Sequence, residues 1–347
     1  MEFTVLREFP LADIEAAWRD YLTRLECPAH YDSPEYFSEP LWAGRRPFAV
    51  LALENGSVKG VVTGIHPDKN AMCGLPSRPQ ISVDPTCDRE SALASLALGL
   101  AAATKSAGLV SVFTWPSLPL TSFEKRGFKC QPLPGNVVLD LTLGPDALFK
   151  QFTKDRRRNI RYAEKNGIEV SEAKSPQDFA DAYAVYSNWR ERRGDQARGR
   201  TLSFEVYCQT MSLKRNRLLL IARLSGNVIA TNIFRFFPGG LFESSANTSL
   251  KDFLHLKPND LLQWRGIEWA CNHGLRRHSL GGSHEFLLRF GGTVVPVLRY
   301  RRDGTWLRSN DLQDAMQGIG RRLVRKMPAV VEKGLRKLAG KEKAPRS

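Results

Sequence analysis

The sequence predicts a mixed α/β protein in which one order of elements occurs twice. Residues 48–65 and 218–236 each contain two apolar stretches rich in β-branched residues, joined by a short turn. The first turn is Asn55-Gly56, and the second lies at 225–227 (Ser-Gly-Asn). Such patterns are typical of β-hairpins. In both halves a helical pattern precedes the hairpin and a further helix leads back to a strand, so we expect two similar sheets in tandem.

Periodicity and turn signals place the elements of the first half. Helices are expected at residues 11–25, 89–108 and 122–126, and strands at 48–54, 59–65, 81–83, 110–115 and 137–143. Residues 67–78 are expected to form an irregular loop, because their proline, glycine and charged residues follow neither period.

The second half repeats this order after one unusual charged stretch. Helices are expected at 177–192, 204–212 and 259–273, and strands at 168–171, 218–224, 228–236, 241–247, 279–280 and 294–301. Residues 194–200 are expected to be a polar loop that contains arginine.

Residues 146–166 carry the densest positive charge of the two halves. Their apolar positions recur at helical spacing with a gap across the charged middle, which predicts one helix or two short helices end to end. Asp146 is the expected N-cap, and Asn166-Gly167 the expected stop. The cations are Lys154, Arg156, Arg157, Arg158, Arg161 and Lys165. They form either a solvated basic face or a binding site for an anion.

Composition limits the classes of function. The 347 residues are 42% apolar, enough for a packed core, and the net charge of +15 indicates an anionic partner. No apolar run reaches spanning length and the first residues lack a signal-peptide pattern, so we expect a cytoplasmic protein. Six cysteines without a C-x-x-C pair predict reduced, mostly buried thiols, and the histidines show no metal spacing.

Several short motifs in this order resemble the FemAB-like and CelD-type acyltransferases of the GNAT acetyltransferase superfamily. The motifs are the basic run at 156–170, the segment Lys257-Pro258-Asn259-Asp260 before the long helix, and 289–292 (Arg-Phe-Gly-Gly). Leu287 stands where that family usually has lysine, and Asn259 where it has glycine. The glycine-rich pyrophosphate loop of ordinary acetyl-CoA enzymes is not visible between 247 and 260.

The resemblance implies two tandem GNAT-like domains, 1–145 and a catalytic 146–305, followed by a basic helical tail at 306–347. It implies direct transfer from an acyl-CoA such as acetyl-CoA, with no permanently bound cofactor. The acceptor would be an amine or hydroxyl of a cell-envelope or polysaccharide precursor, as in cellulose biosynthesis. Two alternatives stay open: an aminoacyl-tRNA donor, or a non-catalytic protein that binds nucleic acid or an anionic surface. The tail either packs on the body or lies on an anionic membrane.

Candidate site residues follow from the same comparison. Glu243, on the strand at 241–247, is a candidate general base if it faces the core, and an ordinary surface residue if it does not. His284 lies in a glycine-containing loop and is either a second catalytic group or incidental. Candidate donor-binding residues are Arg156, Arg157, Arg158, Arg161, Lys257, Asn259 and Asp260. Candidate acceptor-binding residues are Asn247, Gly281, Gly282 and Arg289; no metal ligand is expected.

Overall fold

The computed structural model describes residues 1–42, 44–66, 69–194, 201–305 and 308. Met1–Arg302 form one compact unit and Asp303–Ser347 a second. The predicted tail at 306–347 lies outside the described residues apart from Arg308, and so do residues 195–200 of the predicted polar loop. Within the described ranges, no helix has both the length and the apolar character needed to cross a membrane.

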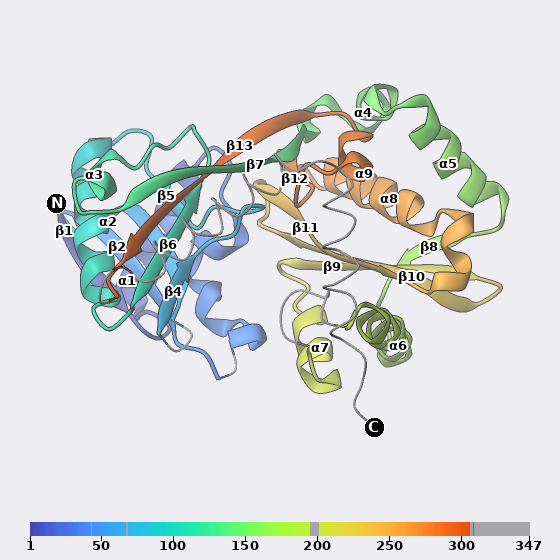
Figure 1. The fold of residues 1–347 in the computed structure, drawn as a ribbon, viewed down its shortest axis with the longest axis horizontal. Coiled ribbons are helices and arrows are strands. Elements are labelled where there is room, and N and C mark those ends of the chain that lie inside the picture. The colour runs from blue at the N-terminus through green and yellow to red at the C-terminus, as the bar shows by residue number, and fades with distance from the viewer. Residues whose placement is uncertain (43, 67–68, 195–200, 306–307, 309–347) are drawn as a thin grey trace, which may run out of the picture. The chain divides into compact units, whose positions relative to one another are not determined.

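Thirteen strands of the described chain form one mixed sheet that continues through both halves (Figure 1). The order is β1 (Glu2–Leu6), β2 (Pro47–Glu54), β3 (Ser57–Ile65), β4 (Asn70–Cys73), β6 (Leu109–Thr114), β13 (Thr293–Asp303), β7 (Lys129–Asp140), β12 (Arg277–Ser279), β11 (Leu241–Ser249), β10 (Asn227–Phe236), β9 (Arg217–Leu224) and β8 (Glu169–Glu172), with β5 (Ile81–Val83) paired to β3. The predicted mixed α/β class is confirmed. The expectation of two separate sheets is wrong, because the halves share one sheet.

Strand β7 joins the two halves. Its first part pairs antiparallel with β13, and its last residues pair antiparallel with β12. The final strand of the sheet therefore returns from the second half to lie between β6 and β7. The strand predicted at 137–143 overlaps only the apolar C-terminal end of β7. Its first part was missed because Pro132 and Pro134 interrupt any strand pattern, and a register shift in the β7–β13 pair lies beside Pro134.

In the first half the predicted hairpin is confirmed. Asn55 and Gly56 adopt φ values of 50° and 77°, as a tight hairpin turn requires. Helices α1 (Ala12–Arg24) and α2 (Arg89–Ala103) pack on the alternating side chains of β2, in separate hydrophobic clusters. The short helix α3 (Thr121–Glu124) follows β6. The loop predicted at 67–78 is wrong in part, since it contains β4.

In the second half, helices cover both faces of the sheet. On β9, Leu218 and Leu220 pack in a cluster with α8 (Pro258–Asn272), whereas Leu219 and Ile221 pack with α6 (Pro176–Arg193) and α7 (Phe204–Met211). This alternation follows from the two-residue period of a strand. Figure 1 shows α8 and α6 on opposite sides of β9 and β10.

The charged stretch forms two helices, α4 (Pro145–Gln151) and α5 (Lys154–Lys165). Of the two predicted alternatives, one helix or two short helices, the second is confirmed. The chain is extended at Phe152, and the hydroxyl of Thr153 caps α5 by accepting from the amide of Arg156 at 3.3 Å. Asp146 as N-cap is wrong: Gly144 holds that position, and Asp146 lies in the first turn of α4.

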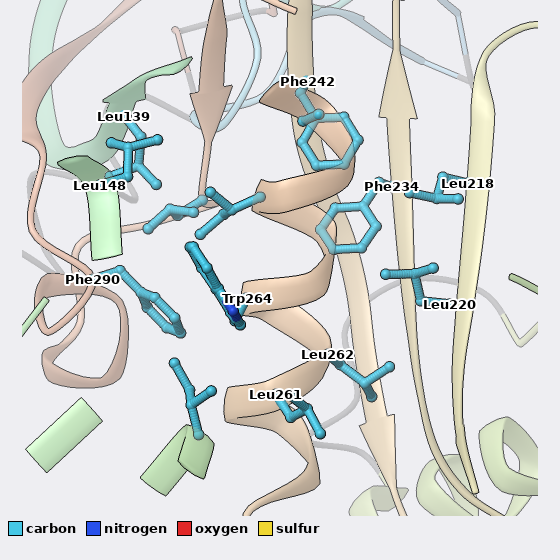
Figure 2. Close-up of a cluster of buried hydrophobic side chains, with 14 of the residues drawn as sticks. Leu139, Leu148, Leu218, Leu220, Phe234, Phe242, Leu261, Leu262, Trp264 and Phe290 are labelled. Carbon is cyan, nitrogen blue, oxygen red and sulfur yellow. The ribbon is translucent and has the colours of Figure 1, made fainter. Parts of the chain in front are cut away.

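Helix α8 lies at the centre of the second core (Figure 2). On one side Trp264 packs against Phe149, with ring centres 4.8 Å apart. On the other side the Phe234 ring stacks on Phe242 at 4.6 Å. A Cβ atom on Gly266 would lie 2.3 Å from the Phe234 ring, so glycine permits this close approach.

All six cysteines are free thiols, as predicted. The expectation that most of them are buried is wrong. Only Cys73 is buried, Cys130 is exposed, and the other four are half-buried.

Candidate active site

The parallel pair β11–β12 opens after three residues. Leu241, Phe242 and Glu243 of β11 pair with β12, and β11 then continues to Ser249 without it. At the same point the register between β10 and β11 shifts: Phe234 pairs with Ser244, but Ile233 pairs with Ala246. The extra residue is Ser245, a β-bulge that bends the strand. Beyond Glu243 the main-chain groups of β11 do not pair with β12, and this leaves a gap between the two strands.

The N-terminus of α8 follows the end of β11. The side-chain amide of Asn259 donates to the Ser249 hydroxyl at 3.3 Å, which ties the first turn of the helix to the strand. Lys257, the residue before α8, has φ 63° and ψ 37°. A left-handed conformation costs a residue with a Cβ roughly 1–2 kcal/mol, and such strain is often found at functional sites.

The first half contains no such gap along its corresponding pair. All four residues of β4 pair with β6, from Asn70 to Cys73. Helix α2 is capped by the carboxylate of Asp88, which accepts from the amides of Glu90 and Ser91 at 3.1 and 3.4 Å. A carboxylate there occupies the anion position of the helix end. The early end of pairing between β11 and β12 thus has no counterpart in the β4–β6 pair.

Glu243 faces the first half of the chain rather than solvent. Its carboxylate accepts from Arg78 at 3.1 Å and from the Ser77 hydroxyl at 3.1 Å, and Arg235 lies 3.7 Å away. Burial alone would raise the pKa of Glu243, but the two arginines outweigh it, so the pKa lies below its ordinary value. An ion-paired carboxylate of low pKa is a weak proton acceptor, so these contacts argue against the predicted role as general base.

A buried polar network lies on the α8 side of β11. The hydroxyl of Ser244 lies 3.0 Å from Nε2 of His278 and 3.2 Å from the side-chain amide nitrogen of Gln263. The amide of Asn232 donates to Oε1 of Gln263 at 3.0 Å. Burial lowers the pKa of His278 to about 3, so its ring is neutral at neutral pH. Sequence analysis did not select these residues; the available signal was a polar residue inside otherwise apolar stretches, as at Asn232 and Gln263.

The predicted arginine cluster is divided. Arg156 points inward, is 2% exposed, and forms an ion pair with Asp260, another candidate donor-binding residue. It also donates to the main-chain oxygen of Phe286 at 2.6 Å. Helical spacing explains the direction, because Arg156 lies four residues before the buried Ile160. We therefore infer that Arg156 and Asp260 stabilise the interface between α5 and α8 and do not bind a ligand.

The other arginines face outward. Arg157 and Arg161 line a pocket of about 610 Å³ between α4, α5 and α8, together with Asp146, Phe149, Lys150, Ile160, Glu164 and Trp264. Arg157 donates to the main-chain oxygens of Lys150 and Phe152, which closes the end of α4. Among the described residues, Lys150, Arg157 and Arg161 form no ion pair, whereas the exposed Arg158 pairs with Asp155 at 3.2 Å. The pocket is lined by three cations, Lys150, Arg157 and Arg161, and by two carboxylates, Asp146 and Glu164.

The predicted acceptor-binding residues lie around the gap or in the loop after β12. Gly281 has φ 90°, and a Cβ there would lie 3.4 Å from the main-chain oxygen of Ser244. The main-chain oxygen of Gly282 accepts from the amide of Val137 at 2.8 Å. His284 is exposed and precedes α9 (Glu285–Leu288).

Three further positions complete the predicted set. Arg289 forms an ion pair with Glu285. Asn247 is half-buried on β11, with its Oδ1 atom buried and without a hydrogen-bond partner. Leu287 is buried in the core of the second half, so the position at which the resembling family carries lysine supplies no cation.

Comparison with known proteins identifies the fold and a domain in the second half. Residues 150–291 match the model of a family described as an acetyltransferase (GNAT) domain. No curated protein sequence matches the chain. Among solved structures, the fold is similar to FemX, with a TM-score of 0.65 at 13% identity over 87% of this chain and 97% of FemX.

Two further structures have similar folds. A tandem GNAT protein from the clavulanic acid biosynthesis pathway gives a TM-score of 0.57 at 14% identity, over 88% of this chain and 99% of its own. L-PGS from Bacillus licheniformis gives 0.58 at 13% identity, over 88% and 96%. The chain therefore has a tandem GNAT fold, and its second half matches the GNAT acetyltransferase domain.

Proposed function

We propose that this protein is an acyltransferase whose second half, residues 146–305, holds the acyl donor in the gap between β11 and β12. The observation that carries the proposal is the end of β11–β12 pairing at Glu243, beside the bulge at Ser245. The N-terminus of α8 contacts the far end of β11, where Asn259 donates to Ser249. Main-chain groups freed from the sheet can bind an acyl carbonyl, and a helix N-terminus favours an anionic group of the donor.

The reaction is direct transfer in a ternary complex. The acceptor's amine or hydroxyl attacks the carbonyl carbon while the protein orients both substrates. Lys257 and Asn259 bind the donor at the end of β11, and Asn247, Gly281, Gly282 and Arg289 form the acceptor side. His284, exposed in the loop after β12, accepts the acceptor's proton in place of Glu243, which is already ion-paired.

The proposed donor is an acyl-CoA such as acetyl-CoA, bound as a co-substrate. The match of residues 150–291 to the acetyltransferase domain supports this choice. The proposed acceptor is an amine or hydroxyl of a cell-envelope or polysaccharide precursor, by the resemblance to CelD-type enzymes.

An aminoacyl-tRNA donor is the second candidate. The similarity to FemX supports it, as does the open pocket lined by Lys150, Arg157 and Arg161, since RNA binding depends strongly on cations that contact phosphates. In this case the same gap would hold an aminoacyl ester in place of a thioester.

Binding and turnover of the full chain test the proposal. Calorimetric titration with acetyl-CoA should show binding, and glucosamine, which offers both an amine and hydroxyls, should promote release of free CoA. If acetyl-CoA neither binds nor reacts but aminoacyl-tRNA is deacylated in the presence of an amine, the second candidate replaces the first. Binding of either ligand without any turnover would identify a non-catalytic binding protein.

A further inference from the structure

Ser244 occupies a special place in the second half of the sheet. It is the first β11 residue beyond the last pair with β12, and it directly precedes the bulged Ser245. Its neighbours in the polar network, Asn232, Gln263 and His278, are at most 2% exposed, whereas Ser244 is half-buried. Of these four residues, Ser244 is therefore the one that is partly accessible, at the point where β11 and β12 part.

The surroundings make this network costly to bury. The His278 ring packs edge-on against Phe242 at 4.7 Å, inside a cluster of aromatic and aliphatic side chains. Buried polar groups in such a place destabilise the fold unless they are hydrogen-bonded. Apolar residues would pack at these positions at a lower cost. The network therefore indicates a functional role for the Ser244 hydroxyl, which it orients.

The hydrogen-bond directions can be derived from the partners. Oε1 of Gln263 accepts from Asn232, so its amide nitrogen is directed to Ser244 and donates to Oγ at 3.2 Å. Nδ1 of His278 is buried without a partner. A neutral imidazole carries one hydrogen, and an unpaired buried N–H is rarer than an unpaired acceptor, so the hydrogen resides on Nε2. His278 then also donates to Oγ of Ser244, at 3.0 Å.

Two donors thus occupy the lone pairs of Ser244 Oγ. The acceptor within reach of its own hydrogen is Oε1 of Gln263 at 3.4 Å, a long contact to an oxygen that already accepts from Asn232, so this hydrogen can turn to a ligand where β11 and β12 part. We propose that Ser244 is an oxyanion donor, whose hydroxyl binds the carbonyl oxygen of the acyl group, with Gln263 and His278 as positioning residues. This inference rests on the proposed acyl transfer and adds a side-chain donor to the main-chain groups of β11.

The step balances without a covalent enzyme intermediate. The acceptor's nitrogen or oxygen forms a bond to the carbonyl carbon, and the π electrons move to the carbonyl oxygen. Ser244 donates a hydrogen bond to this oxyanion and keeps its proton. The carbon–sulfur bond of a thioester then breaks, and the leaving thiolate takes up the proton that His284 has accepted from the acceptor. Ser244 is neither acylated nor deprotonated.

The test compares Ser244→Ala with Ser244→Thr in the full chain, with acetyl-CoA as donor and glucosamine as acceptor. Loss of an oxyanion donor lowers kcat by about 10²–10³-fold, with KM for the donor little changed. Threonine, which keeps the hydroxyl, should restore most of the turnover. Ser95→Ala is the matched control, because it removes a buried hydroxyl bonded to the main-chain oxygen of Glu2 in the first half. It should leave kcat unchanged.

Positioning is tested with Gln263→Leu. This variant should lower kcat in the same direction, and the double variant with Ser244→Ala should be no slower than Ser244→Ala alone, because both remove one interaction. Circular dichroism and urea unfolding identify variants that merely unfold.

Three outcomes overturn the inference. If a folded Ser244→Ala variant turns over at the wild-type rate, Ser244 is not an oxyanion donor, while the proposed acyltransferase function still stands. An acetyl adduct on Ser244 in the intact mass spectrum replaces the oxyanion role with nucleophilic catalysis. Absence of transfer by the wild type from both acetyl-CoA and aminoacyl-tRNA refutes the proposed function, and the inference with it.

Discussion

Arg78 of the first half and Glu243 of the second form a buried ion pair, with Nη1 and Oε2 3.1 Å apart. A second buried pair, Glu39 with Arg217, joins the same two halves. Breaking a buried pair leaves a charge without compensation, which is strongly destabilising. These pairs fix the first half against β9–β11, so the first half supports the gap even though its own β4–β6 pair is closed.

Glu243→Gln should therefore affect stability more than turnover. Removing the carboxylate leaves Arg78 and Arg235 without their counter-charge, and we expect a loss of about 3–5 kcal/mol in the free energy of unfolding. Acyl transfer by the folded variant should stay within a few-fold of wild type. Urea unfolding and steady-state kinetics measure the two effects, with Glu15→Gln, in the exposed pair with Arg19, as control. A hundredfold loss of kcat without loss of stability would restore Glu243 as the general base.

Replacing Arg157 and Arg161 together by alanine should weaken binding of a phosphate-bearing ligand at the pocket between α4 and α5. Fewer cations in contact with phosphates also make binding less dependent on salt. Fluorescence anisotropy with bulk tRNA, and calorimetry with acetyl-CoA, each over a range of salt concentrations, show which ligand uses the pocket. Arg158→Ala is the control, because Arg158 is exposed and paired with Asp155. Equal affinities and salt slopes in all proteins would make the arginines a solvated face.

Lys257→Gly should separate strain from binding. Glycine adopts φ 63° without the Cβ penalty, so the variant should be at least as stable as wild type. If the Lys257 ammonium binds the donor, the affinity for acetyl-CoA should nevertheless fall. Ser225→Gly relieves a similar strain, at φ 48° in the β9–β10 turn, and should leave donor affinity unchanged. Unchanged affinity in Lys257→Gly would remove Lys257 from the donor site.

Stability should depend on pH through Asp32. Burial raises the pKa of Asp32 to about 7, although its Oδ2 accepts from the amide of Ala29 at 3.0 Å. The pKa of an aspartate in the unfolded chain is ~3.9, so rising pH ionises the unfolded chain first and favours unfolding between about pH 4 and 7. The stability of wild type relative to Asp32→Asn should fall across this range and level off above it. A difference that is constant from pH 4 to 8 would show that Asp32 titrates normally.

Local patterns in the sequence determined most of the elements. The hairpin turns at Asn55 and Ser225 and helix α8 follow from residue preferences that act over a few positions, whereas the pattern at 146–166 left one helix or two open. The tandem order followed from these elements, and the structure confirms the mixed α/β class. Strand β4 and the first part of β7 were missed, because pairing with partners far along the chain overrides weak local preference.

Only the tertiary structure decided how the polar residues are used. Arg156 and Arg157 are adjacent in sequence, yet helical rotation buries one against Asp260 and leaves the other on a pocket wall. Ser244 and His278 are separated by 34 residues and meet because β11 and β12 pair in parallel just before they part. Sequence spacing carries no information on such contacts, because the distance between them is set by sheet order and by the packing of α8.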